Sequence, residues 1–454
     1  MPVRNFPKSK DFGNAHGRKN LLSFLAMQIR GILSLFAPVH GGGMEIFMYI
    51  KRDMEKLVAE LSSEYPAILI TGPRQVGKTT MLQKLMEGTE RTYVTLDDLT
   101  ARQLAKTDPE LFFQTYGTPI LIDEVQYAPE LFTYIKIMVD KNHAPGEFWL
   151  TGSQAFKLMQ GIQESLAGRV AALNLSSLSQ NEIYNHCANE PFKLDLEQLK
   201  QKQSKADSAD LMQIFERIWR GSMPAIVSGT YSNRDIFYSS YISTYIDRDV
   251  RELLPTIDSL NFLQFITAVA ARASQLLNVA EIARDASIDQ VTAKKWLGIL
   301  ETLGLIFYLR PYSNNTLKRT IKTPKLYFTD CGLAVYLTKW SSPETLESGA
   351  MNGAIFENYV VSEIVKSYYN AGKEPYLYYY RDKDAREIDV IMESDGQLHP
   401  IEIKKSASPN NSMVKAFSVL DKATVPRGTG AVICMKSELS ALSRENLIVP
   451  VWLI

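Results

Sequence analysis

Cysteine is scarce in this chain, and its three occurrences, Cys187, Cys331 and Cys434, are far apart. They form no C-x-x-C pair, which argues against a zinc site or a disulfide framework and favours a reducing compartment. Neither sign of charge prevails, because 50 Lys and Arg residues balance 50 Asp and Glu residues. The chain therefore has no overall field that would draw it towards nucleic acid or a membrane surface.

Long apolar runs are missing as well. No stretch is apolar enough for long enough to form a transmembrane helix, so we expect a cytoplasmic protein without a membrane part. The sequence also has no internal repeat and no long low-complexity tract. With 454 residues, 45% of them hydrophobic, it should form two to four domains with sizeable cores.

Residues 1–43 do not fit the pattern of the rest of the chain. They are rich in Lys, Arg, Gly and Asn, and polar residues interrupt their one apolar patch, Leu21 to Val39, which makes a poor signal-peptide core. Three glycines immediately precede Met44, and glycine codons are purine-rich, as a bacterial ribosome-binding site would be. We therefore expect a gene start set too early. A short amphipathic targeting or membrane-surface segment is the alternative.

The octet at residues 72–79 fits the phosphate-binding pattern G-x-x-x-x-G-K-S/T completely. An apolar run before it predicts a buried strand, and the residues after it predict a helix. Backbone N–H groups of such a loop close around a phosphate at the positive end of the helix. Lys78 can then reach the β- and γ-phosphates, and Thr79 can ligate Mg²⁺. The predicted ATP-binding residues are Gly72, Pro73, Arg74, Gln75, Val76, Gly77, Lys78, Thr79 and Thr80.

A later run, residues 119–125, is apolar and carries two carboxylates, Asp123 and Glu124, near its end. Asp123 suits the outer sphere of Mg²⁺. Glu124 faces the other way on an extended chain, where it can orient and deprotonate the attacking water. A solvated turn with two acids is the alternative interpretation of this pair.

Two further positions are candidates for sensing the nucleotide. Ser153 and Gln154 follow an apolar run at residues 147–151 and could hydrogen-bond the γ-phosphate or the water. A plain strand-end turn is the alternative. Arg169 is a candidate arginine finger or phosphate sensor, and a surface arginine is the alternative.

Strands predicted near residues 91–97, 119–123, 147–151 and 171–175 alternate with helices. This order predicts an α/β fold with a parallel sheet covered on both faces. A strand with sensing residues beside the Asp-Glu strand is typical of the additional-strand, catalytic-glutamate division of P-loop ATPases. We assign this domain to residues 44–186 and a helical linker or lid to residues 187–260. Tyrosines at helical spacing in the lid indicate one packed helix face.

Residues 261–340 are predicted to form a winged-helix module. Helix, helix, turn, helix and strand follow one another between residues 262 and 309. The stretch Arg310 to Lys325 contains basic residues and no acid, which fits a wing that contacts DNA. Binding to a protein partner is the alternative. The third helix could present four polar side chains to a groove: Gln290, Thr292, Lys294 and Lys295.

Residues 341–454 are predicted to form a PD-(D/E)xK nuclease-like domain. A helix is followed by two alternating strands, and period two puts Glu402 and Lys404 on one face. Asp389, on the neighbouring strand, can join Glu402 in holding Mg²⁺ while Lys404 polarises a water. Glu357 could add a carboxylate from the helix. Because the surrounding charges are mixed, we favour a fold kept for recognition, with cleavage weak or absent.

From Met44 to Ile454 the chain resembles prokaryotic AAA+-type ATPases whose C-terminal half is a conserved domain of unknown function. The resemblance lies in ITGPRQVGKTT, PILIDEVQ, LTGSQ, SLAGRV, YIDRDVRELL, PKLYFTDCGL, FENYVVSEI, REIDVIM and PIEIKKS. It implies ATP binding, slow hydrolysis, a winged-helix module and a nuclease-like C-terminal fold.

We therefore expect an ATP-dependent, Mg²⁺-requiring molecular switch that relays nucleotide state to its C-terminal half and that could form an oligomer. Two alternatives remain open. The first is a DNA nuclease whose site, Asp389, Glu402 and Lys404, is gated by ATP. The second is a protein adaptor that binds ATP without hydrolysing it.

Overall fold

The structure is a computed structural model that describes residues 49–153, 166–186, 190–254, 257–313, 323–384 and 386–454. Residues 48–454 form one compact unit. The predicted N-terminal extension, Gln154 and most of the predicted basic wing lie outside the described residues. Within the described part, no helix combines the length and the apolar character needed to cross a bilayer.

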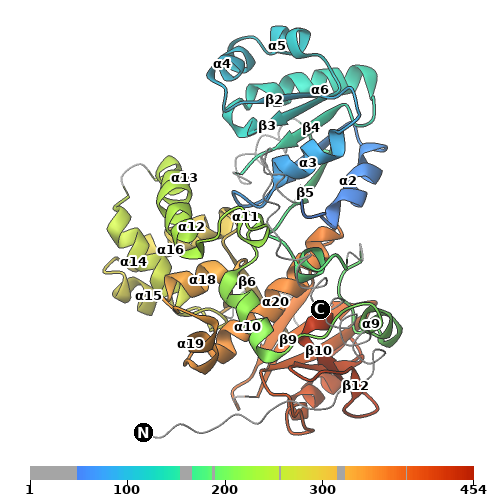
Figure 1. Ribbon diagram of the computed structural model, residues 1–454, viewed down its shortest axis with the longest axis vertical. Coiled ribbons are helices and arrows are strands. Elements are labelled where there is room, and N and C mark those ends of the chain that lie inside the picture. The colour runs from blue at the N-terminus through green and yellow to red at the C-terminus, as the bar shows by residue number, and fades with distance from the viewer. Residues whose placement is uncertain (1–48, 154–165, 187–189, 255–256, 314–322, 385) are drawn as a thin grey trace, which may run out of the picture. The chain divides into compact units, whose positions relative to one another are not determined.

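The first domain is built on a five-stranded parallel sheet with the order β2-β3-β4-β1-β5 (Figure 1). Strand β4 lies between β1 and β3, so one additional strand separates the strand before the phosphate loop from the strand that ends in Asp123. The parallel α/β sheet predicted from the sequence is confirmed. Its strands are β1 (Ala67–Thr71), β2 (Thr92–Thr95), β3 (Ile120–Asp123), β4 (Phe148–Thr151) and β5 (Val170–Asn174).

Helices cover both faces of this sheet because its central strands are apolar on both sides. In β1, Ile68 and Ile70 pack with α2 and α3, whereas Ala67 and Leu69 pack with the helices of the other face. Alternate residues of a strand point to opposite faces, so one buried strand serves two cores. The helices are α2 (Met54–Ser62), α3 (Lys78–Met86), α4 (Leu99–Thr107), α5 (Pro109–Tyr116) and α6 (Glu130–Asn142), with the short η1 (Val125–Tyr127).

A mainly helical region follows the sheet domain. The short α8 (Gln180–Ile183) starts with a capping box formed by Ser179 and Glu182. The predicted tyrosine face is partly confirmed, because Tyr238 and Tyr241 are buried, while the side chain of Tyr245 lies outside the description. The other elements are α9 (Leu196–Gln203), α10 (Leu211–Arg220), α11 (Pro224–Val227), α12 (Arg234–Ser240), η2 (Tyr241–Ile246) and α13 (Asp247–Leu253).

The order of elements predicted for a winged helix is present. Helices α14 (Ser259–Ala270), α15 (Val279–Asp285) and α16 (Gln290–Thr302) precede the antiparallel hairpin of β6 (Ile306–Pro311) and β7 (Lys325–Phe328). Strand β6 also pairs in parallel with β8, so the hairpin continues the C-terminal sheet.

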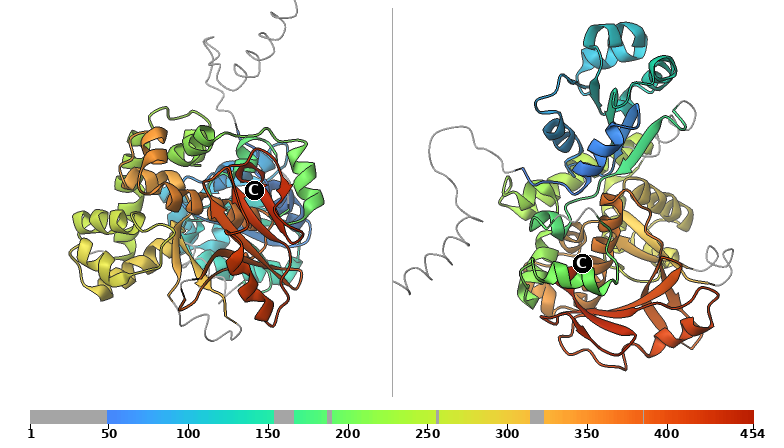
Figure 2. Two further views of the ribbon diagram at one scale, coloured as in Figure 1. Left: turned by 90° about the horizontal axis from the view of Figure 1, so that it is seen from below. Right: turned by 90° about the vertical axis from the view of Figure 1, so that its right-hand side faces the viewer.

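The C-terminal sheet has eight strands in the order β12-β13-β11-β10-β9-β8-β6-β7. Figure 2 shows its C-terminal strands in orange and red. The two strands predicted near residues 386–392 and 398–404 are confirmed as β9 and β10, which pair antiparallel. The elements are α18 (Cys331–Leu337), α19 (Pro343–Ser348), α20 (Asn352–Asn370), β8 (Leu377–Arg381), β9 (Glu387–Ser394), β10 (Gln397–Lys404), η3 (Lys415–Lys422), β11 (Gly430–Cys434), β12 (Ser440–Ala441), β13 (Asn446–Pro450) and η4 (Val451–Leu453).

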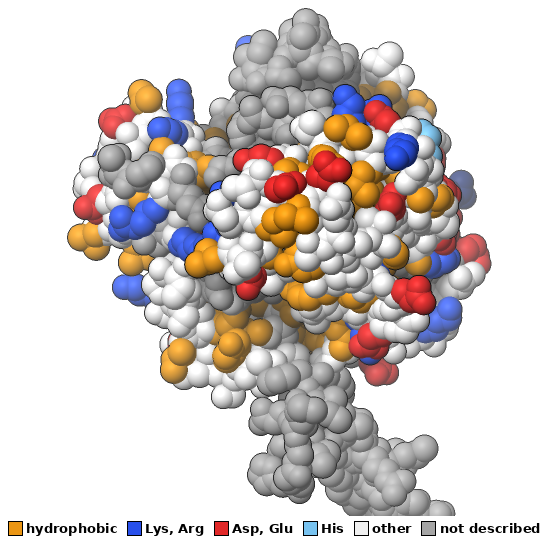
Figure 3. Space-filling model, turned by 90° about the horizontal axis from the view of Figure 1, so that it is seen from above, with side chains coloured by type: hydrophobic (Ala, Val, Ile, Leu, Met, Phe, Trp, Pro, Cys, Tyr) orange, Lys and Arg blue, Asp and Glu red, His pale blue; other side chains and the backbone are white. Residues whose placement is uncertain are grey.

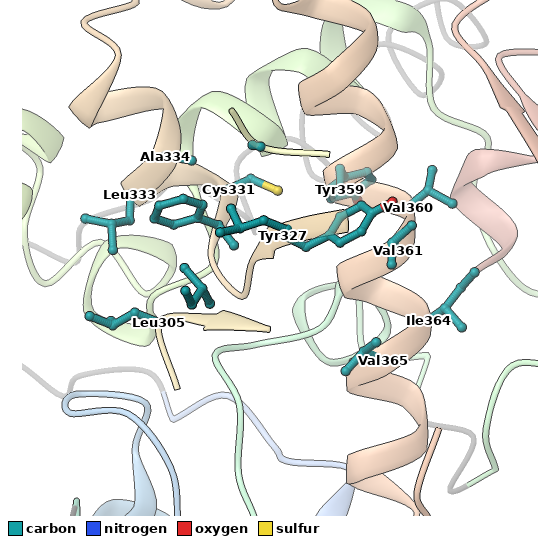
Figure 4. Packing of buried hydrophobic residues seen from close by; sticks show 14 of the residues in the cluster. Leu305, Tyr327, Cys331, Leu333, Ala334, Tyr359, Val360, Val361, Ile364 and Val365 are labelled. Carbon is teal, nitrogen blue, oxygen red and sulfur yellow. The ribbon is translucent and has the colours of Figure 1, made fainter. Parts of the chain in front are cut away.

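Helix α20 packs into the largest hydrophobic core. Figure 4 shows Val360, Val361 and Ile364 of this helix beside Tyr327 of β7. Polar side chains of α20 are buried as well. Asn358 accepts a hydrogen bond from the Phe328 amide and donates to the Phe328 carbonyl. These two bonds satisfy the backbone N–H and C=O groups of Phe328 in β7 and the polar atoms of the Asn358 side chain. Asn358 can therefore be buried with 0% exposure.

Asp330 joins three helices inside this core. Its carboxylate accepts hydrogen bonds from Ser222 N and Oγ at 2.8 and 2.9 Å, Tyr238 Oη at 2.7 Å and Leu333 N at 2.8 Å. Gly332 lies so close to α10 that a Cβ there would stand 2.6 Å from Gly221 Cα. The T-D-C-G-L stretch is therefore a packing junction between α10, α12 and α18.

We expect Asp330→Asn to destabilise the protein by about 1–3 kcal/mol, because the amide nitrogen would face donors that now point at a carboxylate oxygen. Urea denaturation measures the loss. Asp207→Asn is the matched control, since Asp207 is exposed. Equal midpoints for the two variants would contradict the role assigned to Asp330.

Candidate functional site: a phosphate loop joined to the lid

The phosphate loop needs both of its glycines. Gly72 has φ 137°, and a Cβ there would lie 2.1 Å from the Leu175 carbonyl oxygen. Gly77, at φ 92°, is the left-handed N-cap of α3. The first turn of a helix leaves backbone N–H groups without intrahelical acceptors, and these attract phosphate. Lys78 is buried, and its Nζ donates to the carbonyls of Gly72 and Pro73 at 2.9 and 2.8 Å.

Arg52, just before α2, anchors the phosphate loop through hydrogen bonds. Its Nη1 donates to the Val76 carbonyl at 2.6 Å, and its Nη2 donates to the Ser176 carbonyl at 2.8 Å. Its Nε pairs at 2.8 Å with Glu182, whose side chain is fully buried. A buried charge pair of this kind is stable only when its remaining donors and acceptors are satisfied, as they are here. The loop is thereby tied to the segment that leaves β5.

Thr79 and Asp123 meet beside the loop, as the sequence predicts for a magnesium site. Thr79 Oγ1 donates to Asp123 Oδ1 at 2.7 Å, Thr151 donates to the same oxygen, and Tyr93 Oη donates to Oδ2 at 3.3 Å. A protein-bound Mg²⁺ with a nucleotide takes one or two protein oxygens, and phosphates and waters fill its other positions. One hydroxyl and one carboxylate fit that need, and the described residues contain no cluster of three potential ligands.

Glu124 follows β3 in the left-handed region, at φ 54° and ψ 44°. A non-glycine residue in this region carries backbone strain that the surrounding structure must hold. Gln126 Nε2 donates to Glu124 Oε2, and Ser153 Oγ donates to the same oxygen at 3.4 Å. The structure thus brings Ser153, a predicted sensor, directly to the predicted catalytic base.

Arg74 connects this base to a distant helix. Its Nη1 lies 3.4 Å from Glu124 Oε1, and its Nε lies 2.9 and 2.7 Å from the two carboxylate oxygens of Asp249 in α13. Burial disfavours the guanidinium charge, but the hydrogen bonds and charge of Asp249, followed by the charge of Glu124, outweigh burial and raise the pKa of Arg74. The site is therefore closed by a residue 175 positions away along the chain.

A second contact follows the same route. Arg248, the neighbour of Asp249, donates to Tyr127 Oη at 3.0 Å, and Tyr127 lies three residues after Glu124. The sequence analysis missed both α13 residues as part of the site. The available signal was the charge run D-R-D-V-R-E, in which Asp249 and Val250 are buried.

The structure places Arg169 away from these side chains. Its Nε lies 2.5 Å from Asp140 Oδ1, and its side chain is 30% exposed. The arginine-finger role stays a prediction.

The predicted nuclease-like residues do meet. Lys404 Nζ lies 2.7 Å from Glu402 Oε1 and 3.7 Å from Asp389 Oδ2. Glu357 of α20 belongs to the same cluster, and burial, followed by the charge of Asp389, raises the pKa of both Glu357 and Glu402 to about 7. The structure corrects one expectation, because Lys325 lies in this cluster with its side chain only 5% exposed. It is no part of a basic DNA-binding surface.

Comparisons with known proteins agree with this geometry. Residues 64–184 match a family model described as an AAA domain. Residues 211–344 and 352–454 match two models described as domains of unknown function, DUF8612 and DUF4143. Uncharacterized proteins of Mycobacterium bovis and Mycobacterium tuberculosis are each 29% identical over 375 residues, which is 82% of this chain and 77% of theirs.

Two solved structures show a general likeness. The Walker-type ATPase PABY2304 of Pyrococcus abyssi is 13% identical, with a TM-score of 0.43, and covers 66% of this chain and 99% of its own. The RuvB Holliday junction branch migration motor of Thermotoga maritima is 14% identical, with a TM-score of 0.29, over 56% and 88%. The AAA match, the strand order and the loop support an ATP-binding, P-loop ATPase of the AAA type.

Nucleotide binding should be linked to a proton on Lys78. Burial lowers the pKa of this ammonium to about 8, so the folded protein without nucleotide gains stability as the pH rises from about 8 towards the ordinary value of 10.5. Phosphates favour the charged form. We therefore expect ATP binding at pH 9 to take up a proton and to weaken as the pH rises above 8.

Calorimetric titrations in two buffers of different ionisation enthalpy measure this uptake. Lys78→Arg is the control, because arginine stays protonated throughout. The same proton uptake in both proteins would contradict the assignment to Lys78.

Proposed function

We propose that this protein is an ATP-hydrolysing molecular switch of the AAA type, which relays its nucleotide state to the C-terminal half. The observation that carries the proposal is the position of Arg74. This residue belongs to the phosphate loop, and its guanidinium contacts both the candidate base Glu124 and Asp249 of α13. We therefore expect a change in the bound nucleotide to alter the contacts of Arg74 and, through Asp249, the hold on α13.

The chemistry follows from the residues around the loop. Lys78 and the backbone amides bind the phosphates, while Thr79 and Asp123 would hold a magnesium ion, which would neutralise part of the phosphate charge. Glu124 orients and deprotonates the attacking water. Ser153 lies within hydrogen-bonding reach of Glu124. The transition state is stabilised mainly by positioning and by fixed charges.

Arg74 supplies the control in this proposal. While its Nη1 pairs with Glu124, the carboxylate is restrained and its negative charge is partly neutralised. A triphosphate in the loop is a stronger partner for a guanidinium than a single carboxylate is, because arginine matches phosphate oxygens bidentately. Binding would draw Arg74 from Glu124 or from Asp249, free the base and alter the hold on α13.

A second connection lies behind the loop and gives the signal a path to α20. Glu182, which pairs with Arg52, belongs to the same short segment as Gln180. Gln180 N donates to Glu363 of α20 at 2.7 Å, and its Oε1 accepts from Tyr359 Oη at 2.8 Å. The loop and the central C-terminal helix thus share one buried polar network, which can carry two discrete arrangements.

DNA is a candidate partner for the winged-helix module in this scheme. The α16 side chains Gln290, Lys294 and Lys295 are exposed, and Thr292 is half-buried. On the face shown in Figure 3, lysines and arginines are interspersed with acids. On that face the described residues form no broad surface of one charge that would suit a phosphate backbone. The turnover test below distinguishes the switch from a protein adaptor that binds ATP without hydrolysing it.

Glu124→Gln should bind ATP with little change in affinity and lose about 10²–10⁴-fold in turnover, because the amide keeps the shape and removes the base. Phosphate release and nucleotide titration measure the two quantities. Glu130→Gln, an exposed position a few residues on, is the matched control. Turnover at the wild-type rate in Glu124→Gln would reject this catalytic role, and absence of turnover in the wild type would favour the adaptor.

Asp249→Asn tests the relay. It keeps the side-chain size but removes the charge that holds Arg74, so ATP should still bind while its effect on α13 is lost. Amide hydrogen exchange of residues 247–253, with and without a non-hydrolysable ATP analogue, reports this effect. Asp97→Asn is the control, because Asp97 is exposed in the phosphate-loop domain and pairs only loosely with Arg102, at 3.7 Å. An unchanged response in Asp249→Asn would show that the signal takes another route.

A further inference from the structure

Lys325 stands where three carboxylates of the C-terminal sheet converge. Its Nζ lies 2.7 Å from Glu387 Oε1, 3.1 Å from Glu357 Oε1 and 4.0 Å from Asp389 Oδ1. Two of these acids come from β9 and one from α20, whereas Lys325 is the first residue of β7. The hairpin therefore inserts a positive charge into an acidic cluster built by other elements.

Protein donors already engage one oxygen of each of Glu357, Asp389 and Glu402. Glu357 Oε1 accepts from Tyr327 Oη at 2.6 Å as well as from Lys325, and Asp389 Oδ2 accepts from the Ile403 amide at 2.8 Å. Glu402 Oε1 pairs with Lys404, while its Oε2 is buried without a hydrogen-bond partner among the described residues. These donors compete for the oxygen lone pairs that a divalent cation would need.

Charge leads to the same result. An ion that bridged Asp389 and Glu357 would lie within a few ångströms of the Lys325 ammonium, in a site with little water to screen the repulsion. In the described part of the chain, no group of three Asp, Glu, His or Cys side chains is arranged to hold a metal. The residues present therefore do not fit the metal that a PD-(D/E)xK nuclease needs.

We infer that Lys325 takes the place of a divalent cation in this core, so that the cluster works as an ionic clamp and not as a metal-dependent nuclease site. The clamp fastens hairpin β6–β7 to α20 and β9. Tyr327, two residues along β7, extends the attachment: its hydroxyl reaches Glu357, and its ring lies beside α20 (Figure 4). This inference does not depend on ATP hydrolysis.

Mn²⁺ titration followed by electron paramagnetic resonance, without nucleotide, tests the inference. Wild type and Asp389→Asn should bind the same amount of Mn²⁺, because the cluster takes none. Lys325→Ala should gain one Mn²⁺ per chain, and the double variant Lys325→Ala/Asp389→Asn should lose it again. Lys404→Ala is the matched control: it removes the other lysine of the cluster, whose side chain is 41% exposed, and should gain no site.

Three results of the titration would overturn the inference. One is a wild-type Mn²⁺ site that disappears in Asp389→Asn. Another is a folded Lys325→Ala protein that binds no additional Mn²⁺, and the third is an equal gain in Lys404→Ala. The comparison of wild type with Asp389→Asn stands even if Lys325→Ala does not fold. Mn²⁺-dependent DNA cutting by wild type that Asp389→Asn abolishes would likewise restore the nuclease interpretation.

Discussion

The contact on which the functional part of this structure depends is a buried guanidinium held between two carboxylates. Arg74 belongs to the phosphate loop, yet its strongest partner, Asp249, comes from α13, and its second partner is the candidate base Glu124. Breaking one side of a buried charge pair leaves the other charge uncompensated, so these groups have to rearrange together. In the proposed switch, that constraint is what would couple the nucleotide site to α13 without requiring a large movement.

The same principle recurs at the base of the loop. Arg52 joins the loop to Glu182, and the neighbouring Gln180 reaches α20 through Glu363 and Tyr359. Apolar packing alone would leave such interfaces free to adjust continuously. Buried hydrogen-bonded charges specify a few discrete arrangements, which is the property that a switch needs.

In the C-terminal core, residues of the types found in a nuclease site form the ionic clamp inferred above. Glu357, Asp389, Glu402 and Lys404 do converge, yet Lys325 enters the cluster from a hairpin that begins outside it. Along the chain, Lys325 closes a stretch of basic residues and therefore looked like part of a nucleic-acid surface. Its burial against acids reverses that interpretation, because an ammonium at this position competes with a metal.

Local patterns were sufficient for the phosphate loop, the Asp123–Glu124 pair, the parallel sheet and the β9–β10 hairpin. The reason is physical: loop geometry, strand period and helix caps depend on residues within a few positions of one another. Contacts between distant segments have no such local signature, since a charge run such as D-R-D-V-R-E reads equally well as a solvated helix. The pairing of Arg74 with Asp249 and the place of Lys325 were therefore decided only by tertiary structure, which sets the burial and the partner of each charge.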